Sequence, residues 1–340
     1  MKEIQISGNA HFHYPMDTIF GLLWLNEKKS VEIPKVIPYL GEWGEILSNK
    51  IAIEPLLEIP IKISLLWISL VESEMYLLEN TLPETKLFNL FNTEDDYTHI
   101  VIGMAPYGHC SIWVAGLRKS SYVCSFQAKK LPNIDFKKVN IYNLDMGIKE
   151  YCHFLLKKSN GILECLPPRN LFAKYMQQFT YRYLPLFEKW IGKEDEKWRK
   201  YEEEDKAIPV FEYIEEALYD GTHDKLHDDG LLKYHEGGKP KKLAVKWYVK
   251  KSEYTAFFWF EDEEICAIFD KFYGAHRDTK TDFIIHIDVE KNKYELALYR
   301  YGLKEPQVIA ESAYQLIVFK NKFECYRSEN YDQPKGAWIW

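Results

Sequence analysis

The chain carries one pattern of apolar residues twice, and this repeat restricts the folds open to it. Residues 61–130 and 241–320 each combine two strand-like segments, a short amphipathic segment and two or three further strand-like segments. Trp67 and Trp247 occupy equivalent places, and "THIVIG" in the first copy parallels "DFIIHI" in the second. A repeat built from core-facing positions indicates shared packing rather than shared chemistry. The sequence therefore predicts two similar halves and leaves their function open.

The predicted fold is α+β, with two repeated antiparallel sheet units, each with a helix on one face, joined by a helical middle segment. We place an N-terminal α+β unit at residues 1–145, a helical connecting segment at 146–240 and a C-terminal α+β unit at 241–340. The connecting segment is predicted to be helical because "NLFAKYMQQFTYRYLPLFEKW" and "PVFEYIEEALYD" space their apolar residues as helices do. Each sheet must bury one face, so we expect the halves to share a core or to stack.

Charge and hydropathy argue against several classes of function. The net charge of −7 opposes non-specific nucleic-acid binding, which needs a positive field. The N-terminal stretch "MKEIQISGNAHFHYPMD" has no long apolar run after its lysine, so we expect no secretory signal. The most apolar window, between Leu56 and Leu70, is interrupted by Glu58, Pro60 and Lys62 and is too short to span a bilayer. We therefore expect a cytoplasmic protein that has no nucleic-acid or membrane partner.

The cysteines and histidines predict no metal or cofactor. The six cysteines are widely scattered and form no C-x-x-C pair, which favours reduced thiols. His223 and His227 are four residues apart, a spacing that places two imidazoles on one face of a helix. Gly221 and Gly230 bracket them, so an exposed polar loop is the favoured interpretation, and metal binding there is left open.

Two polar segments are the candidates for chemistry, although no catalytic residue is assigned. In "GMAPYGHCSIW", His109 precedes Cys110, and adjacent strand residues point to opposite faces, so His109 is not expected to activate the thiol. In "FECYRSENY", the charged side chains Glu324, Arg327 and Glu329 fit an ion-pair network better than an active site. The chain has no G-x-S-x-G elbow, no P-loop and no G-x-G-x-x-G fingerprint.

The stretch "LWISL…EMYLLENTLPETKLFNLF…YTHIVIGMAPYGHCSIWVAGL" resembles the uncharacterised bacterial DUF2931-type family, whose members are often labelled lipoproteins. The tryptophan-containing strand, the Leu-Pro before a helix and the G-x-A-P-x-G-x-x-x-x-W motif carry the resemblance. The second half, from "DGTHDKLHDDG" to the C-terminal "KGAWIW", is also similar to sequences of that family. The resemblance implies a shared fold and supplies no catalytic residues to carry over.

The leading functional expectation is a non-catalytic protein-binding module, and its sharpest form is a cytoplasmic immunity protein that neutralises a bacterial toxin. Acidic balance, abundant aromatic residues and the lack of a catalytic signature motivate it, because interfaces favour Tyr, Trp and Arg. The expected partner-binding residues are Tyr107, His109, Glu194, Asp195, Glu202, Glu203, Arg327 and Glu329. The alternatives are a hydrolase or transferase with an unrecognised site at "FECYRSENY" or the His223 loop, and a structural or envelope-associated protein.

Overall fold

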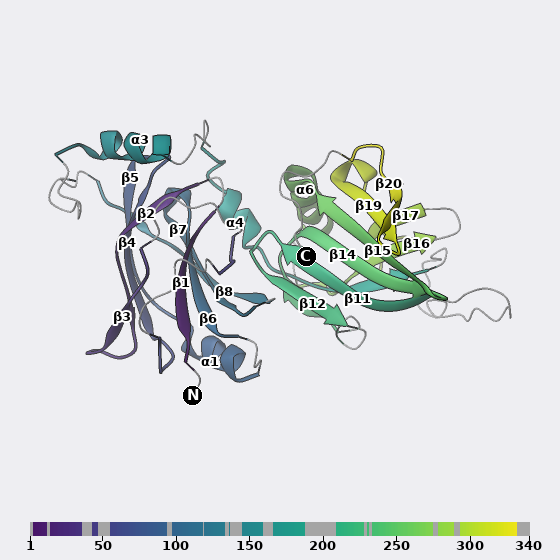
Figure 1. Cartoon of the computed structure of the whole chain (residues 1–340), viewed down its shortest axis with the longest axis horizontal. Coiled ribbons are helices and arrows are strands. Elements are labelled where there is room, and N and C mark those ends of the chain that lie inside the picture. Colours follow the sequence, from purple (N-terminus) through teal and green to yellow (C-terminus); the bar gives the residue numbers. More distant parts are fainter. Residues whose placement is uncertain are drawn as a thin grey trace. The chain divides into compact units, whose positions relative to one another are not determined.

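The computed structural model divides the chain into two compact units (Figure 1). Unit 1 consists of Met1–Met176 and Asp220–Thr222, and unit 2 consists of Gln177–Tyr219 and His223–Trp340. The structure describes residues 3–11, 14–35, 43–46, 55–93, 97–117, 119–132, 136, 145–158, 166–187, 209–227, 230, 233–274, 278–288 and 293–331.

Unit 1 is a sandwich of two sheets. One runs in the order β1 (Gln5–Ala10), β6 (His99–Met104), β7 (His109–Ala115) and β8 (Ser120–Gln127). The other runs in the order β3 (Ser30–Glu32), β2 (Met16–Trp24), β4 (Lys62–Ser69), β5 (Glu74–Thr81) and β9 (Lys129–Lys130). Inward side chains of both sheets form one buried cluster, which Leu87 and Phe91 of helix α1 (Glu84–Thr93) join.

Unit 2 is a second sandwich. Its larger set of strands runs in the order β12 (His223–His227), β11 (Pro209–Leu218), β14 (Pro240–Val249), β15 (Ser252–Phe260), β19 (Tyr314–Lys320) and β20 (Phe323–Arg327). The facing sheet runs in the order β13 (His235–Gly237), β10 (Phe179–Leu186), β16 (Thr281–Asp288), β17 (Lys293–Arg300) and β18 (Gln307–Val308). Helix α6 (Asp262–Tyr273) contributes Ile265, Phe269 and Phe272 to the buried cluster between them.

The two units repeat one topology. In each, a parallel pair (β1 with β6, β10 with β16) belongs to one sheet, and a three-stranded antiparallel run (β2-β4-β5, β11-β14-β15) belongs to the other. A helix, α1 or α6, connects the last strand of that run to the parallel pair. Such agreement in strand order and connection indicates a duplicated structural unit.

The buried tryptophans define the register of the repeat. Trp67 lies opposite Tyr76 and Trp247 lies opposite Tyr254, with ring centroids 5.7 and 5.4 Å apart. The neighbouring strand carries a β-bulge beside each tryptophan, between Thr18 and Phe20 in β2 and between Phe211 and Tyr213 in β11. A β-bulge is a specific local irregularity that regular strands lack. Its recurrence beside the equivalent tryptophan therefore supports a residue-by-residue comparison of the units.

The predicted α+β class is wrong, because the protein is mainly β, with 53% of the described residues in strands and 17% helical. The predicted helical middle segment is also wrong in its described part beyond α3 (Ile148–Lys158) and α4 (Leu171–Tyr175), where the chain forms β10, β11 and β12. In β10, the side chains of Phe179, Tyr181 and Tyr183 alternate with half-buried neighbours. This period of two, carried by aromatic residues that favour strands, outweighs the helix-like spacing. None of the described helices has the length and apolar character needed to cross a bilayer.

Candidate functional site

The turn that contains Tyr107 is held by a carboxylate. Tyr107 has a left-handed backbone (φ 59°) in the short helix η1 (Pro106–Gly108). Its N–H donates to Glu72 Oε2 (2.8 Å), and the phenol of Tyr76 donates to Glu72 Oε1 (2.8 Å). Its own phenol donates to the carbonyl of Pro167 (2.9 Å). The half-buried Tyr107 therefore serves to fix the β6–β7 connection.

His109, the second candidate in this turn, is buried. Its ring stacks on Phe172 (centroids 5.6 Å apart), and its Nε2 lies 2.8 Å from the hydroxyl of Ser111. Burial lowers the pKa of His109 from 6.5 to about 4, so the imidazole is neutral at pH 7. Cys110 points into the opposite, inner cluster, and burial raises the pKa of its thiol. The structure thus brings no activated Cys–His pair together here.

The glycines of the family-like motif have a packing role. A Cβ on Gly103 would lie 2.6 Å from Trp113 Cζ3 and 3.0 Å from Trp43 Cη2. The indole of Trp113 donates to the carbonyl of Asp220 (2.7 Å) within unit 1. Trp113 is fully buried, so the G-x-A-P-x-G-x-x-x-x-W motif specifies a packing site for this tryptophan and a tight turn rather than reactive groups.

The acidic candidates Glu194, Asp195, Glu202 and Glu203 lie outside the described residues. His223 and His227 lie on strand β12 rather than in a loop, so their spacing along an extended chain separates the rings by roughly 13 Å at about 3.3 Å per residue. Such a separation does not suit a shared ion. Among the described residues, no group of three or more His, Cys, Asp or Glu side chains is arranged to hold a metal.

Arg327 and Glu329 are both exposed at the end of β20. Arg327 donates to both carboxylate oxygens of Glu324, at 2.9 and 2.5 Å, and its guanidinium lies over the ring of Tyr331 at 4.8 Å. The Glu324–Arg327 pair confirms part of the predicted ion-pair network. The pair also places Arg327 beside an aromatic surface.

That surface is a row of half-buried rings on the outer face of unit 2. Phe257 and Trp259 of β15 stack with centroids 5.9 Å apart, Phe319 of β19 lies 5.9 Å from Phe257, and Tyr331 lies 5.8 Å from Trp259. We call these four residues the aromatic row. Alternating strands of a sandwich ordinarily place polar side chains on this face. The sequence contained a sign of this aromatic row, because in "TAFFWF" the residues that point to either face of the strand are apolar.

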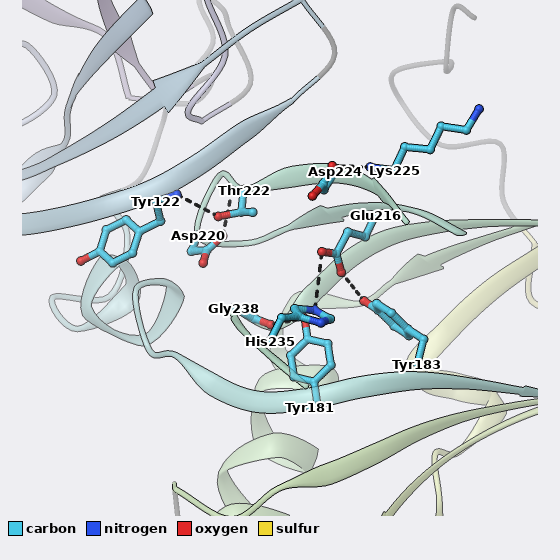
Figure 2. Close-up of polar contacts among 10 residues, drawn as sticks. All are labelled: Tyr122, Tyr181, Tyr183, Glu216, Asp220, Thr222, Asp224, Lys225, His235 and Gly238. Atoms are coloured by element: carbon cyan, nitrogen blue, oxygen red, sulfur yellow. Dashed lines mark hydrogen bonds and ion pairs between the residues drawn. The ribbon is translucent and has the colours of Figure 1, made fainter. Parts of the chain in front are cut away.

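A buried polar cluster lies inside unit 2 (Figure 2). Glu216 of β11, 2% exposed, accepts a hydrogen bond from the phenol of Tyr183 (2.6 Å), and its other oxygen lies 3.8 Å from His235 Nε2. The phenol of Tyr181 donates to the carbonyl of Gly238 (3.0 Å), and its ring contacts His235 (4.8 Å). Burial and the adjacent carboxylate raise the pKa of Tyr183 well above its usual value, so the phenol remains a donor.

The repeat shows that Glu216 stands at an apolar position. Glu216 lies opposite Leu243, four residues before Trp247, and in unit 1 Leu23 lies opposite Ile63, four residues before Trp67. Leu23 is fully buried in the core of unit 1. The fold therefore accepts leucine at this place, and the carboxylate is a feature of unit 2 alone. Sequence reasoning missed it because the segment was predicted to be helical.

Figure 2 also draws the turn that completes unit 1. The Thr222 hydroxyl accepts a hydrogen bond from the N–H of Tyr122 (3.2 Å), as Figure 2 shows. The carbonyl of Gly221 accepts one from the hydroxyl of Ser120 (2.6 Å). The side chain of Asp220 accepts the N–H of Thr222 (2.8 Å). These bonds are backbone anchors, so the turn has a structural role.

Residues 40–155 match the model of a family described as "Protein of unknown function (DUF2931)". The match confirms the resemblance predicted from the tryptophan strand and the glycine–proline turn, both of which lie inside it. It does not reach residues 156–340, for which the resemblance stays a prediction. No curated protein and no solved structure matches the chain.

Proposed function

We propose that this chain, whose residues 40–155 belong to the DUF2931 family, is a non-catalytic protein-binding protein that contacts its partner through the aromatic row of unit 2. The row carries the proposal because half-buried Trp, Phe and Tyr rings beside an arginine have the composition of interface hot spots. Its rings are held in place by stacked and edge-to-face contacts with one another, so little side-chain entropy is lost when a partner covers them.

The sharper form of the proposal is an immunity protein whose partner is a bacterial toxin. The net charge of −7 supports it, because a negatively charged protein captures a basic partner faster. If a toxin gene lies next to the gene for this chain, the two can be expressed together to test the immunity proposal directly. Co-expression of the chain is expected to relieve the toxin's growth arrest, and the double substitution Phe257→Ser/Phe319→Ser is expected to abolish that protection.

Site-specific photocrosslinking tests the broader proposal without knowledge of the partner. A benzophenone amino acid replaces Phe319 or Phe257 in cells that encode the chain, and Leu117, 92% exposed in unit 1, provides the control site. A protein adduct formed at both row positions and not at Leu117 is the expected result. Equal labelling at all three positions, or none at the row, would refute the proposal.

A second candidate function is hydrolysis or group transfer at Glu216. The observation in its favour is a buried carboxylate beside a phenol and an imidazole, at a place where unit 1 needs only leucine. Clusters of this kind occur at active sites as well as in structural networks. An activity that disappears in Glu216→Gln, while circular dichroism and the unfolding midpoint stay unchanged, would favour this candidate over the binding function.

A further inference from the structure

We infer that Asp17 makes the docking of helix α3 on unit 1 pH-dependent: the helix stays docked while this carboxyl carries a proton, and it loosens as the carboxyl ionises. Asp17, near the start of β2, contacts α3 directly through Tyr151. The inference goes beyond the binding function proposed above and does not depend on it, because it concerns a different unit and different residues.

Helix α3 is held on unit 1 by an apolar cluster of its own. Ile148, Tyr151, Cys152 and Leu155 lie at positions i, i+3, i+4 and i+7, which form one helical face. They pack with Ile68 of β4 and its neighbours, in a cluster separate from the inner core of unit 1. An element that is held in this way can open locally while the sandwich stays folded.

The carboxyl of Asp17 is buried and poorly supplied with hydrogen-bond donors. The residue is 2% exposed, and the phenol of Tyr151 donates to its Oδ2 (2.5 Å). Among the residues that the structure describes, no group donates to the buried Oδ1. An ionised carboxylate can accept about four hydrogen bonds, and burying its charge without them is costly. The neutral form is therefore favoured while α3 covers this place.

The charged and titratable groups around Asp17 do not offset its burial. Burial raises the pKa of Asp17 above its usual 3.8, and the opposing effects of Tyr151 and of Lys35, an exposed residue after β3, are smaller. The neighbouring thiol of Cys152 stays neutral, because burial raises its pKa to about 12. Strands β4 and β5 contribute the apolar Ile68 and Met75 to the cluster.

The direction of the pH dependence follows from this difference in pKa. When α3 opens, the carboxyl of Asp17 meets water and its pKa returns toward 3.8. The docked state therefore binds the proton more tightly than the open state. Docking is strongest below the pKa of the open state and weakens as the pH rises through the pKa of the docked state. Each unit between the two values weakens docking about tenfold.

The repeat shows that the strand does not need a carboxyl here. Asp17 pairs with the residue after Trp67, and in unit 2 Val210 pairs with the residue after Trp247. The equivalent strand thus carries a side chain that cannot ionise, and Asp17→Val is a substitution that this strand position accepts.

Hydrogen–deuterium exchange of the full-length chain between pH 4 and pH 8 tests the inference, with peptides of α3 compared between the wild type and Asp17→Asn at each pH. Because the amide cannot ionise, we expect the protection of α3 in the wild type, relative to Asp17→Asn, to fall at least about tenfold over this range. Asp17→Val serves as the second variant if Asp17→Asn does not fold. Glu79→Gln, which replaces an exposed acid of β5, is the control and should follow the wild type.

Three other results would overturn the inference. A ratio of α3 protection between wild type and Asp17→Asn that stays constant with pH would show that ionisation of Asp17 does not affect docking. A ratio that rises with pH would show that the docked helix favours the ionised carboxylate. An equal fall in the protection of β6 and β7 would show that the proton stabilises the whole of unit 1 rather than the docking of α3.

Discussion

A double-mutant cycle on Tyr183 and Glu216 tests whether the buried cluster of unit 2 is a matched pair. Tyr183→Phe removes the donor from a carboxylate that is 2% exposed. Hydrogen bonds to charged groups contribute about 1.5–3 kcal/mol, so we expect a loss of about 2 kcal/mol. Glu216→Leu introduces the residue that unit 1 has at this position, but it removes the charged acceptor of the buried Tyr183 phenol, at a cost of about 1–3 kcal/mol.

The double variant Tyr183→Phe/Glu216→Leu removes both polar groups. Replacing a buried polar pair by apolar residues of similar volume is often neutral or stabilising, so we expect stability within about 1 kcal/mol of wild type. The coupling free energy between the two sites is then about 2 kcal/mol or more, well above the few tenths expected of independent sites. This magnitude follows from the 2.6 Å bond and from the leucine that unit 1 has in place of Glu216.

Urea unfolding of the full-length chain, combined with hydrogen–deuterium exchange of peptides from β10 and β11, measures each free energy in the unit concerned. Peptides from β4 and β5 of unit 1 provide the internal control. If the double variant loses as much stability as the two single variants together, the pair is not coupled and the reasoning is refuted.

Three further predictions concern unit 1. His109→Gln should flatten the pH dependence of the unfolding free energy, because burial lowers the pKa of His109 from 6.5 to about 4. In the wild type, the folded state keeps its full stability above pH 6.5. As the pH falls to about 4, the unfolded state takes up the proton first, and about 3 kcal/mol of the unfolding free energy is lost. Gly103→Ala should lower the unfolding free energy by about 1–3 kcal/mol, measured by urea denaturation, because the new methyl group would overlap Trp113. Tyr151→Phe should cost about 1–3 kcal/mol and increase hydrogen exchange in α3, because the buried carboxylate of Asp17 loses its donor.

Each of these predictions has a matched control. His153, an exposed histidine on α3, provides the comparison for His109, and equal pH profiles for the two substitutions would contradict the assigned pKa. Gly147 has open space around its Cβ position, so Gly147→Ala should be tolerated where Gly103→Ala is not. Unchanged exchange in α3 after Tyr151→Phe would show that apolar packing alone holds the helix.

The sequence showed the repeat because its core positions are large and recognisable. Trp67 and Trp247 report the same register, and strand-like segments around them have clear periodicity. The sequence did not show that the middle of the chain is β, because Tyr and Phe at mixed spacing satisfy helical and extended patterns alike. The aromatic row could have been found from "TAFFWF", where both faces of one strand are apolar. The pairing of Glu216 with Tyr183 could not, because it joins two strands whose register the sequence does not specify.

The parallel pair in each unit has a consequence for how the protein is made. β1 is synthesised before β6, and Gln5 pairs with His99, so the ladder that the described residues form with β1 has to wait until β6 has left the ribosome. For β10 the parallel partner also comes late, because Tyr181 pairs with Thr281, although the short strand β13 pairs with β10 earlier, through His235. Long-range pairing of this kind is slow and exposes strand edges in the meantime. Each half of the nascent chain therefore passes through an interval in which chaperone binding would limit aggregation.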